Sequence, residues 1–65
     1  MENSKQDLQP GTVVLIAGFD DLPEHKFEIE EVFDDLVTGI ALTGPLTGEY
    51  GEPSRELILR VVSKA

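Results

Sequence analysis

Hydrophobic residues cluster in three segments of this chain, and polar segments rich in glycine and proline separate them. The first hydrophobic segment, residues 12–17 (TVVLIA), is β-branched and aliphatic and lies between Gly11 and Gly18. It is too short for a stable helix, and its composition favours a largely buried strand. The next segment, residues 18–23, contains two acids and a proline, which predicts a loop.

The second hydrophobic segment, residues 27–44, decides the fold, and its pattern favours a β-hairpin. Residues 27–30 (FEIE) and 38–43 (TGIALT) each alternate in the way typical of half-buried strands. Between them, Asp34 and Asp35 are suited to a two-residue turn, although the glycine that strengthens such a turn is missing. Glu30 and Glu31 interrupt the alternation, so the hairpin requires a bulge at this point.

The same segment also permits an amphipathic helix over about residues 22–38, which would give an α+β fold of the order β-α-β-β. Asp21 and Glu24 would form its capping box, and Gly39 would follow its last turn. The apolar positions also match a helical stripe: Ile29, Val32, Phe33, Leu36, Val37 and Ile40. We favour the hairpin because the segment is rich in β-branched and aromatic residues, and because a helix would leave residues 40–43 little room to pair.

The ends of the chain complete a single small domain, expected over residues 10–63. Residues 1–9 are polar apart from Leu8 and predict a disordered tail. Residues 44–53 (GPLTGEYGEP) predict a turn-rich loop, a wide hairpin tip with Leu46 or Tyr50 folded back. Residues 55–62 predict a last strand whose two faces alternate: Leu57, Leu59 and Val61 against Glu56, Ile58 and Arg60.

This strand order, with a long first loop and a tight central hairpin, resembles an SH3-like small barrel over residues 11–62. The resemblance implies an all-β fold of four to five antiparallel strands. It extends only to strand order and loop lengths. The aromatic pairs and the ligand-groove tryptophan of eukaryotic SH3 domains are missing from the sequence, so it implies no polyproline recognition.

The charge of the chain restricts its partners. The 65 residues include 13 acidic and 5 basic side chains, for a formal net charge of −8. Nucleic acids and anionic membranes would repel such a chain, so we expect neither as a partner. A protein partner with a basic surface fits the charge better, and we expect the chain itself to be a monomer or a weak homodimer. Residues 1–9 do not resemble a signal peptide, and the chain contains no cysteine, which together favour a cytoplasmic location.

The sequence contains no pattern typical of an enzyme, a cofactor site or a metal site. The window of residues 20–35 holds eight acids against one lysine, but their spacing matches no calcium loop. The single histidine, His25, lies among polar residues and is expected in a solvent-exposed loop. No serine or threonine can be assigned to a catalytic triad with it.

We therefore expect a non-enzymatic protein-interaction module or an accessory subunit of a larger complex. The alternative is an acidic mimic that occupies the nucleic-acid groove of a basic protein. Tyr50, the only tyrosine, is a favoured type of interface anchor in the glycine-rich loop. The candidate partner-binding residues are this loop and the paired acids: Leu46, Glu49, Tyr50, Glu52, Asp20, Asp21, Asp34 and Asp35.

Overall fold

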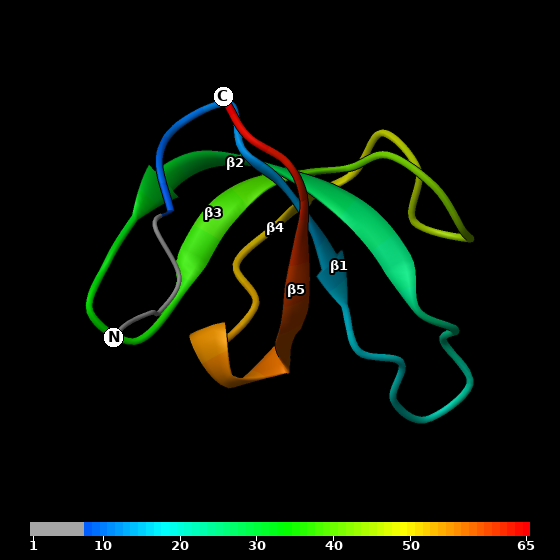
Figure 1. Cartoon of the computed structure of the whole chain (residues 1–65). Helices are drawn as coiled ribbons and strands as arrows, with labels where there is room; N and C mark the ends of the chain where they lie inside the picture. The colour runs from blue at the N-terminus through cyan, green and yellow to red at the C-terminus, as the bar shows by residue number, and fades with distance from the viewer. Residues whose placement is uncertain (1–7) are drawn as a thin grey trace.

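The computed structural model describes residues 8–65 and shows one antiparallel sheet of five strands in the order β4-β3-β2-β1-β5 (Figure 1). Its elements are β1 (Val13–Ile16), β2 (His25–Val32), β3 (Val37–Ala41), β4 (Tyr50–Gly51), the 3-10 helix η1 (Arg55–Leu57) and β5 (Ile58–Ser63). The expected all-β fold is confirmed. The alternative helix over residues 22–38 is wrong, because β2 and most of the β2–β3 hairpin occupy that range.

The central hairpin forms over the predicted residues, although the buried face of β3 carries Val37, Gly39 and Ala41, not Ile40 and Leu42. Val32 pairs with Val37, and the backbone amide of Phe33 donates to the carbonyl of Leu36 at 2.9 Å, which leaves Asp34 and Asp35 as a two-residue tip. Neither aspartate has a positive φ, so the turn belongs to neither of the primed types that favour glycine. This explains how the turn forms without a glycine.

The predicted bulge lies at Glu30. Ile29 pairs with Gly39 and Glu31 pairs with Thr38, so β2 contains one residue more than β3 between these pairs. The extra residue resets the alternation: Ile29 is buried, Glu30 and Glu31 are both exposed, and Val32 again packs on the core. Without it, strict alternation would place Glu31 on the core face.

Strand β2 is the shared element of the sheet. Residues His25 to Glu28 pair with β1, and residues Phe27 to Val32 pair with β3, so Phe27 and Glu28 have partners on both sides. In Figure 1 it curves over the top of the molecule, and β1 and β5 lie beneath it. Because β2 is curved, side chains from β1, β3 and β5 pack with those of β2 in one core.

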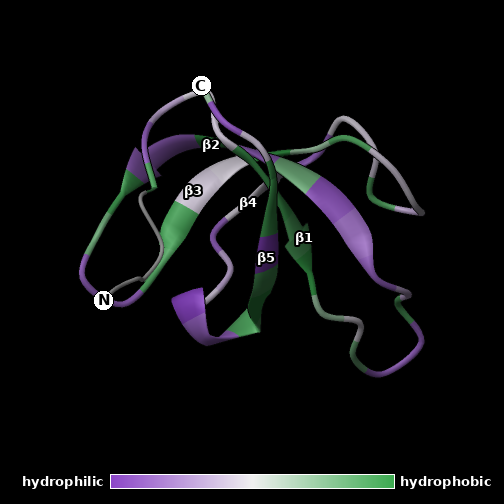
Figure 2. Ribbon diagram, viewed as in Figure 1, coloured by the Kyte–Doolittle hydropathy of each residue, from purple (hydrophilic) through white to green (hydrophobic). Residues whose placement is uncertain are grey.

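The core lies on the inner face of this curved sheet. Strand β1 is hydrophobic along its whole length (Figure 2), and Val14 and Ile16 point inward. One cluster of buried hydrophobic residues comes from β1, β2, β3 and β5: Val14, Ile16, Phe27, Ile29, Val37, Ala41 and Ile58. Thr12, next to β1, is buried, and its carbonyl accepts from the amide of Ile29.

The last strand differs from its predicted form in two ways. Residues 55–57 form η1, which is capped by the hydroxyl of Ser54, so the strand begins at Ile58. Ile58 is buried, whereas Leu59 is 49% exposed, so the predicted division into faces is wrong at these two positions. The reason is a bulge in β5: Leu15 pairs with Arg60 and Ile16 with Ile58, and Leu59 is left out of the register and points to solvent.

Most of the predicted disordered tail, residues 1–9, lies outside the described residues. Of its described part, Leu8 packs against the core, and the backbone of Gln9 exchanges hydrogen bonds with Thr12. Within residues 8–65, the structure contains no helix of the length and hydrophobicity that crossing a bilayer requires.

Candidate functional site

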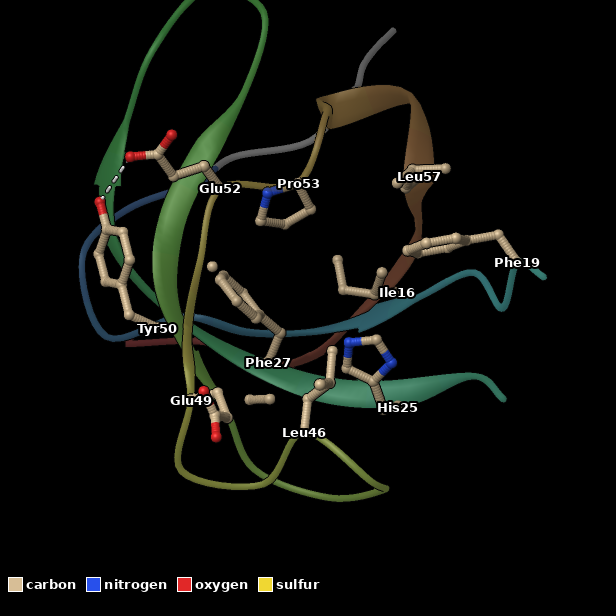
Figure 3. Close-up of a pocket in the computed structure, with 12 residues that line it drawn as sticks. Ile16, Phe19, His25, Phe27, Leu46, Glu49, Tyr50, Glu52, Pro53 and Leu57 are labelled. Carbon is tan, nitrogen blue, oxygen red and sulfur yellow. Dashed lines mark hydrogen bonds between the residues drawn. The ribbon is translucent and has the colours of Figure 1, made fainter. Parts of the chain in front are cut away.

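A hollow of about 310 Å³ with mostly apolar walls opens at one end of the sheet (Figure 3). Its walls come from the β1–β2 loop, the β3–β4 loop, β4 with residues 52–53 after it, and η1. Its floor comes from β1, β2 and the end of β3. We call it the apolar groove, and its main apolar residues are Phe19, Phe27, Leu46, Tyr50, Pro53 and Leu57. Three of these side chains are large and exposed: Phe19, Leu46 and Tyr50.

The first wall is Phe19, which a tight turn at the tip of the β1–β2 loop presents to the groove. Phe19 and Leu22 form two backbone hydrogen bonds of 2.8 and 3.0 Å, and Asp20 and Asp21 lie between them. Asp20 has a φ of 52°. Aspartate is among the few non-glycine types that tolerate this left-handed region, so the acid there has a local structural reason.

The second wall is the glycine-rich β3–β4 loop, which folds back over the sheet. The amide of Thr47 donates to the carbonyl of Gly44, and the amide of Gly48 donates to the carbonyl of Ala41 at 2.8 Å. Gly44 and Gly48 both have positive φ values, near +85°, which L-residues with side chains adopt rarely. These two glycines permit the fold-back that brings Leu46 toward the groove.

The rim of the groove is acidic. The hydroxyl of Tyr50 donates to the Glu52 carboxylate at 3.0 Å (Figure 3), and Glu49 also lines the groove. Among residues 8–65, no lysine or arginine lines the groove. The hydrogen bond to Glu52, more than any burial, raises the pKa of Tyr50 above its ordinary value of 10.0.

This raised pKa gives a direct test of the rim geometry. Glu52→Ala is expected to lower the pKa of Tyr50, because it removes both the hydrogen-bond acceptor and the nearby negative charge. Alkaline titration of the phenolate absorbance measures it without interference, because the chain has one tyrosine and no tryptophan. Glu49→Ala is the control and should leave the pKa unchanged. Equal pKa values in Glu52→Ala and the wild type would contradict the hydrogen bond.

His25 lies at the floor of the groove and is buried, so its expected exposed position is wrong. It is the first residue of β2, not part of the loop before it. The alternation of Phe27 and Ile29 with their polar neighbours continues back to His25. Extending the predicted strand to residue 25 would have placed His25 on the buried face. The ring nitrogen Nδ1 lies 3.1 Å from the carbonyl oxygen of Pro23.

The structure brings half of the predicted site residues together. Leu46, Glu49, Tyr50 and Glu52 all line the apolar groove. Asp20 and Asp21 lie outside it, in the loop that holds Phe19. Sequence reasoning did not find His25, Phe27 and Leu57 as groove residues, because β2 and η1 are separate in the chain from the predicted loop. It also did not single out Pro53 within that loop.

The acids of the hairpin tip, Asp34 and Asp35, do not line the apolar groove. Asp35 borders a second, shallower hollow, which shares Tyr50 and Glu52 with the apolar groove. Among the described residues, no three histidine, aspartate or glutamate side chains are grouped so that they could hold a metal ion.

Comparison with protein-family models, with curated proteins and with solved structures finds no match to this chain. The function of the groove is therefore argued from its own residues.

Proposed function

We propose that this chain is a non-enzymatic protein-interaction module or accessory subunit, cytoplasmic and built as an SH3-like barrel. The strand order supports the barrel: β1 to β4 follow one another across the sheet, and β5 returns to the free side of β1. The curvature of β2, whose start pairs with β1 and whose end pairs with β3, supports it further.

The apolar groove is the observation that carries the proposed function. A small soluble domain tends to bury large hydrophobic side chains, yet Phe19, Leu46 and Tyr50 are each 38% to 56% exposed around one hollow. Grouped apolar exposure of this kind, with a polar rim, is typical of protein-binding surfaces. The rim carboxylates and the net charge of −8 favour a partner with a basic surface.

The lining of the groove supports binding rather than catalysis. Its polar side chains are His25, Glu49, Tyr50 and Glu52, and no serine, threonine or cysteine of the described residues accompanies His25 there. Glu49 and Glu52 are both exposed, whereas general acid catalysis by a carboxyl group relies on an apolar setting that alters its pKa. The hollow is therefore suited to hold an apolar side chain.

A matched pair of leucines tests the proposed function. Leu42 and Leu46 are each 38% exposed, but only Leu46 lines the groove. The partner is first recovered with the tagged chain from its native lysate and then purified. We expect Leu46→Ala to weaken its binding by about 10-fold, the effect of losing about 1.4 kcal/mol of apolar contact, and Leu42→Ala to leave it within about 2-fold. Equal effects of the two substitutions would contradict a partner site in the groove.

The second candidate function, a mimic of nucleic acid, is favoured by the outer side of β2. Glu28, Glu30 and Glu31 are all exposed there, away from the groove. If the chain is such a mimic, the double substitution Glu28→Gln and Glu30→Gln should weaken partner binding more than Leu46→Ala does. Binding would then also fall steeply as salt is added.

A further inference from the structure

The floor of the apolar groove contains one buried polar side chain, His25, which is 7% exposed. A polar group in such a position is costly unless it has hydrogen-bond partners. Its Nδ1 has one in the carbonyl oxygen of Pro23, at 3.1 Å. No hydrogen bond joins Nε2 to any of residues 8–65. In Figure 3 the ring lies between Ile16 and Leu46, inside the groove.

The contact with Pro23 determines where the proton of the ring lies. A carbonyl oxygen only accepts hydrogen bonds, so Nδ1 must be the donor and must carry the hydrogen. In the neutral imidazole ring, Nε2 is then an acceptor. The groove therefore has an acceptor at its floor that can accept a hydrogen bond from a donor of an occupant.

The other polar side chains of the groove are acceptors too. Glu49 and Glu52 contribute carboxylates, which only accept when they are ionised. Tyr50 has a hydroxyl that could donate, but it already donates to Glu52 at 3.0 Å. An occupant that satisfies this set has an apolar part for the walls, hydrogen-bond donors, and positive charge at the rim.

We propose that the apolar groove binds an extended segment of a partner protein in which an apolar side chain lies beside lysine or arginine. The apolar side chain packs on Phe27 between Phe19 and Leu46, and an N–H group of the segment donates to Nε2 of His25. Basic side chains of the segment pair with the rim carboxylates of Glu49 and Glu52. This inference rests on the proposed function, because it names the partner chemistry of the same site.

A second copy of this chain is a poorer occupant. Each copy has a net charge of −8, and the rim of the groove is itself acidic, so docking of one copy on another would bring like charges together. A cationic segment instead neutralises the rim as it enters.

The test titrates the full chain with three probe peptides and monitors binding by nitrogen-15 NMR. The pH is chosen so that the ring nitrogen signals of His25 are those of a neutral imidazole. The probe acetyl-Arg-Leu-Arg-amide should shift the signals of Phe19, Leu46 and Tyr50 and move the Nε2 resonance upfield, as acceptance of a hydrogen bond does. Acetyl-Glu-Leu-Glu-amide tests the charge, and acetyl-Arg-Ser-Arg-amide tests the apolar side chain. Both should bind at least about 10-fold more weakly, which corresponds to about 1.4 kcal/mol.

The variant His25→Asn tests the hydrogen bond itself. The asparagine amide can still donate to the Pro23 carbonyl, but it lacks Nε2. The affinity for acetyl-Arg-Leu-Arg-amide should fall by about 3- to 10-fold, the usual effect of one lost hydrogen bond. If this variant does not fold, the hydrogen bond is tested by whether the Nε2 resonance of the wild-type chain moves upfield when acetyl-Arg-Leu-Arg-amide binds.

The proposal is overturned if the acidic and basic peptides bind equally, or if the basic peptide binds and the Nε2 resonance does not move. It is also overturned if no peptide binds while Leu46→Ala still weakens the native partner. In that last case the proposed function stands, because only the chemistry of the occupant is wrong. The proposed function fails separately, if Leu46→Ala and Leu42→Ala affect the native partner equally.

Discussion

Gly39→Ala is expected to destabilise this domain severely. A Cβ atom at Gly39 would overlap the carbonyl oxygen of Glu28 and lie 2.9 Å from the ring of Phe27. The first obstacle is the backbone of β2, which cannot rotate away as the end of a flexible side chain can. We expect a destabilisation of about 4 kcal/mol or more, which is at the upper end for single substitutions.

That cost is large for a chain of this length. Domains have about 0.05–0.15 kcal/mol of stability per residue, so 65 residues correspond to about 3–10 kcal/mol. Urea unfolding followed by far-ultraviolet circular dichroism, at low temperature, measures the loss in Gly39→Ala. An osmolyte such as sucrose can restore a folded baseline if the variant is mostly unfolded in buffer.

Gly51 is the matched control, because it pairs directly with Gly39 across β3 and β4. A Cβ atom there would lie 3.5 Å from the ring of Phe27 and 3.9 Å from Pro53, which are ordinary contacts. Gly51→Ala should change the free energy of unfolding by about 1 kcal/mol or less, because alanine also restricts the unfolded chain. Equal losses in the two variants would show that close backbone approach is not what distinguishes Gly39.

The central hairpin could be predicted from the sequence because its signals are local. Alternation over residues 27–30 shows which face of β2 is buried, and the interruption at Glu30 and Glu31 requires one extra residue. The alternation of residues 38–43 indicates the wrong face for Ile40 and Leu42. The helical stripe in the same residues was a real competing pattern. The strand forms instead because β2 pairs with both β1 and β3, and a helix over residues 22–38 could not make these backbone hydrogen bonds.

Features that depend on contacts between distant segments could not be predicted in this way. Gly39 fits a helix terminus and a strand centre equally well in the sequence, and only the approach of β2 shows why a glycine is needed. Which of Ile58 and Leu59 faces the core depends on a bulge in β5, and the pairing with β1 determines where that bulge lies. Nothing in the local pattern of β5 specifies that bulge.

In the candidate site, too, residues with a local signal were predicted and residues brought in from distant segments were not. Leu46, Glu49, Tyr50 and Glu52 lie within seven positions of one another, so a single unusual loop was enough to identify them. Phe19 reaches the groove from the β1–β2 loop, and Leu57 reaches it from η1 near the other end of the chain. Their convergence follows from the placement of β1 between β2 and β5.

Phe27 joins the fold to the site, because it is both a core residue and the floor of the groove. It is 2% exposed, pairs with Val14 and Ala41 on the two neighbouring strands, and has Gly39 and Gly51 beside its ring. The two glycines leave space that the aromatic ring fills. Loss of the ring would remove the floor from beneath any apolar side chain bound in the groove.

Phe27→Ala is therefore expected to destabilise the domain by about 3–5 kcal/mol, the range for removing a buried phenylalanine side chain. Phe33→Ala is the matched control, since Phe33 is 48% exposed near the hairpin tip, and its loss should cost about 0.5 kcal/mol. Urea unfolding at equal osmolyte concentration compares the two variants. Similar losses at both positions would mean that Phe27 is not the packed floor of the groove, and the argument for an apolar side chain bound above it would fail as well.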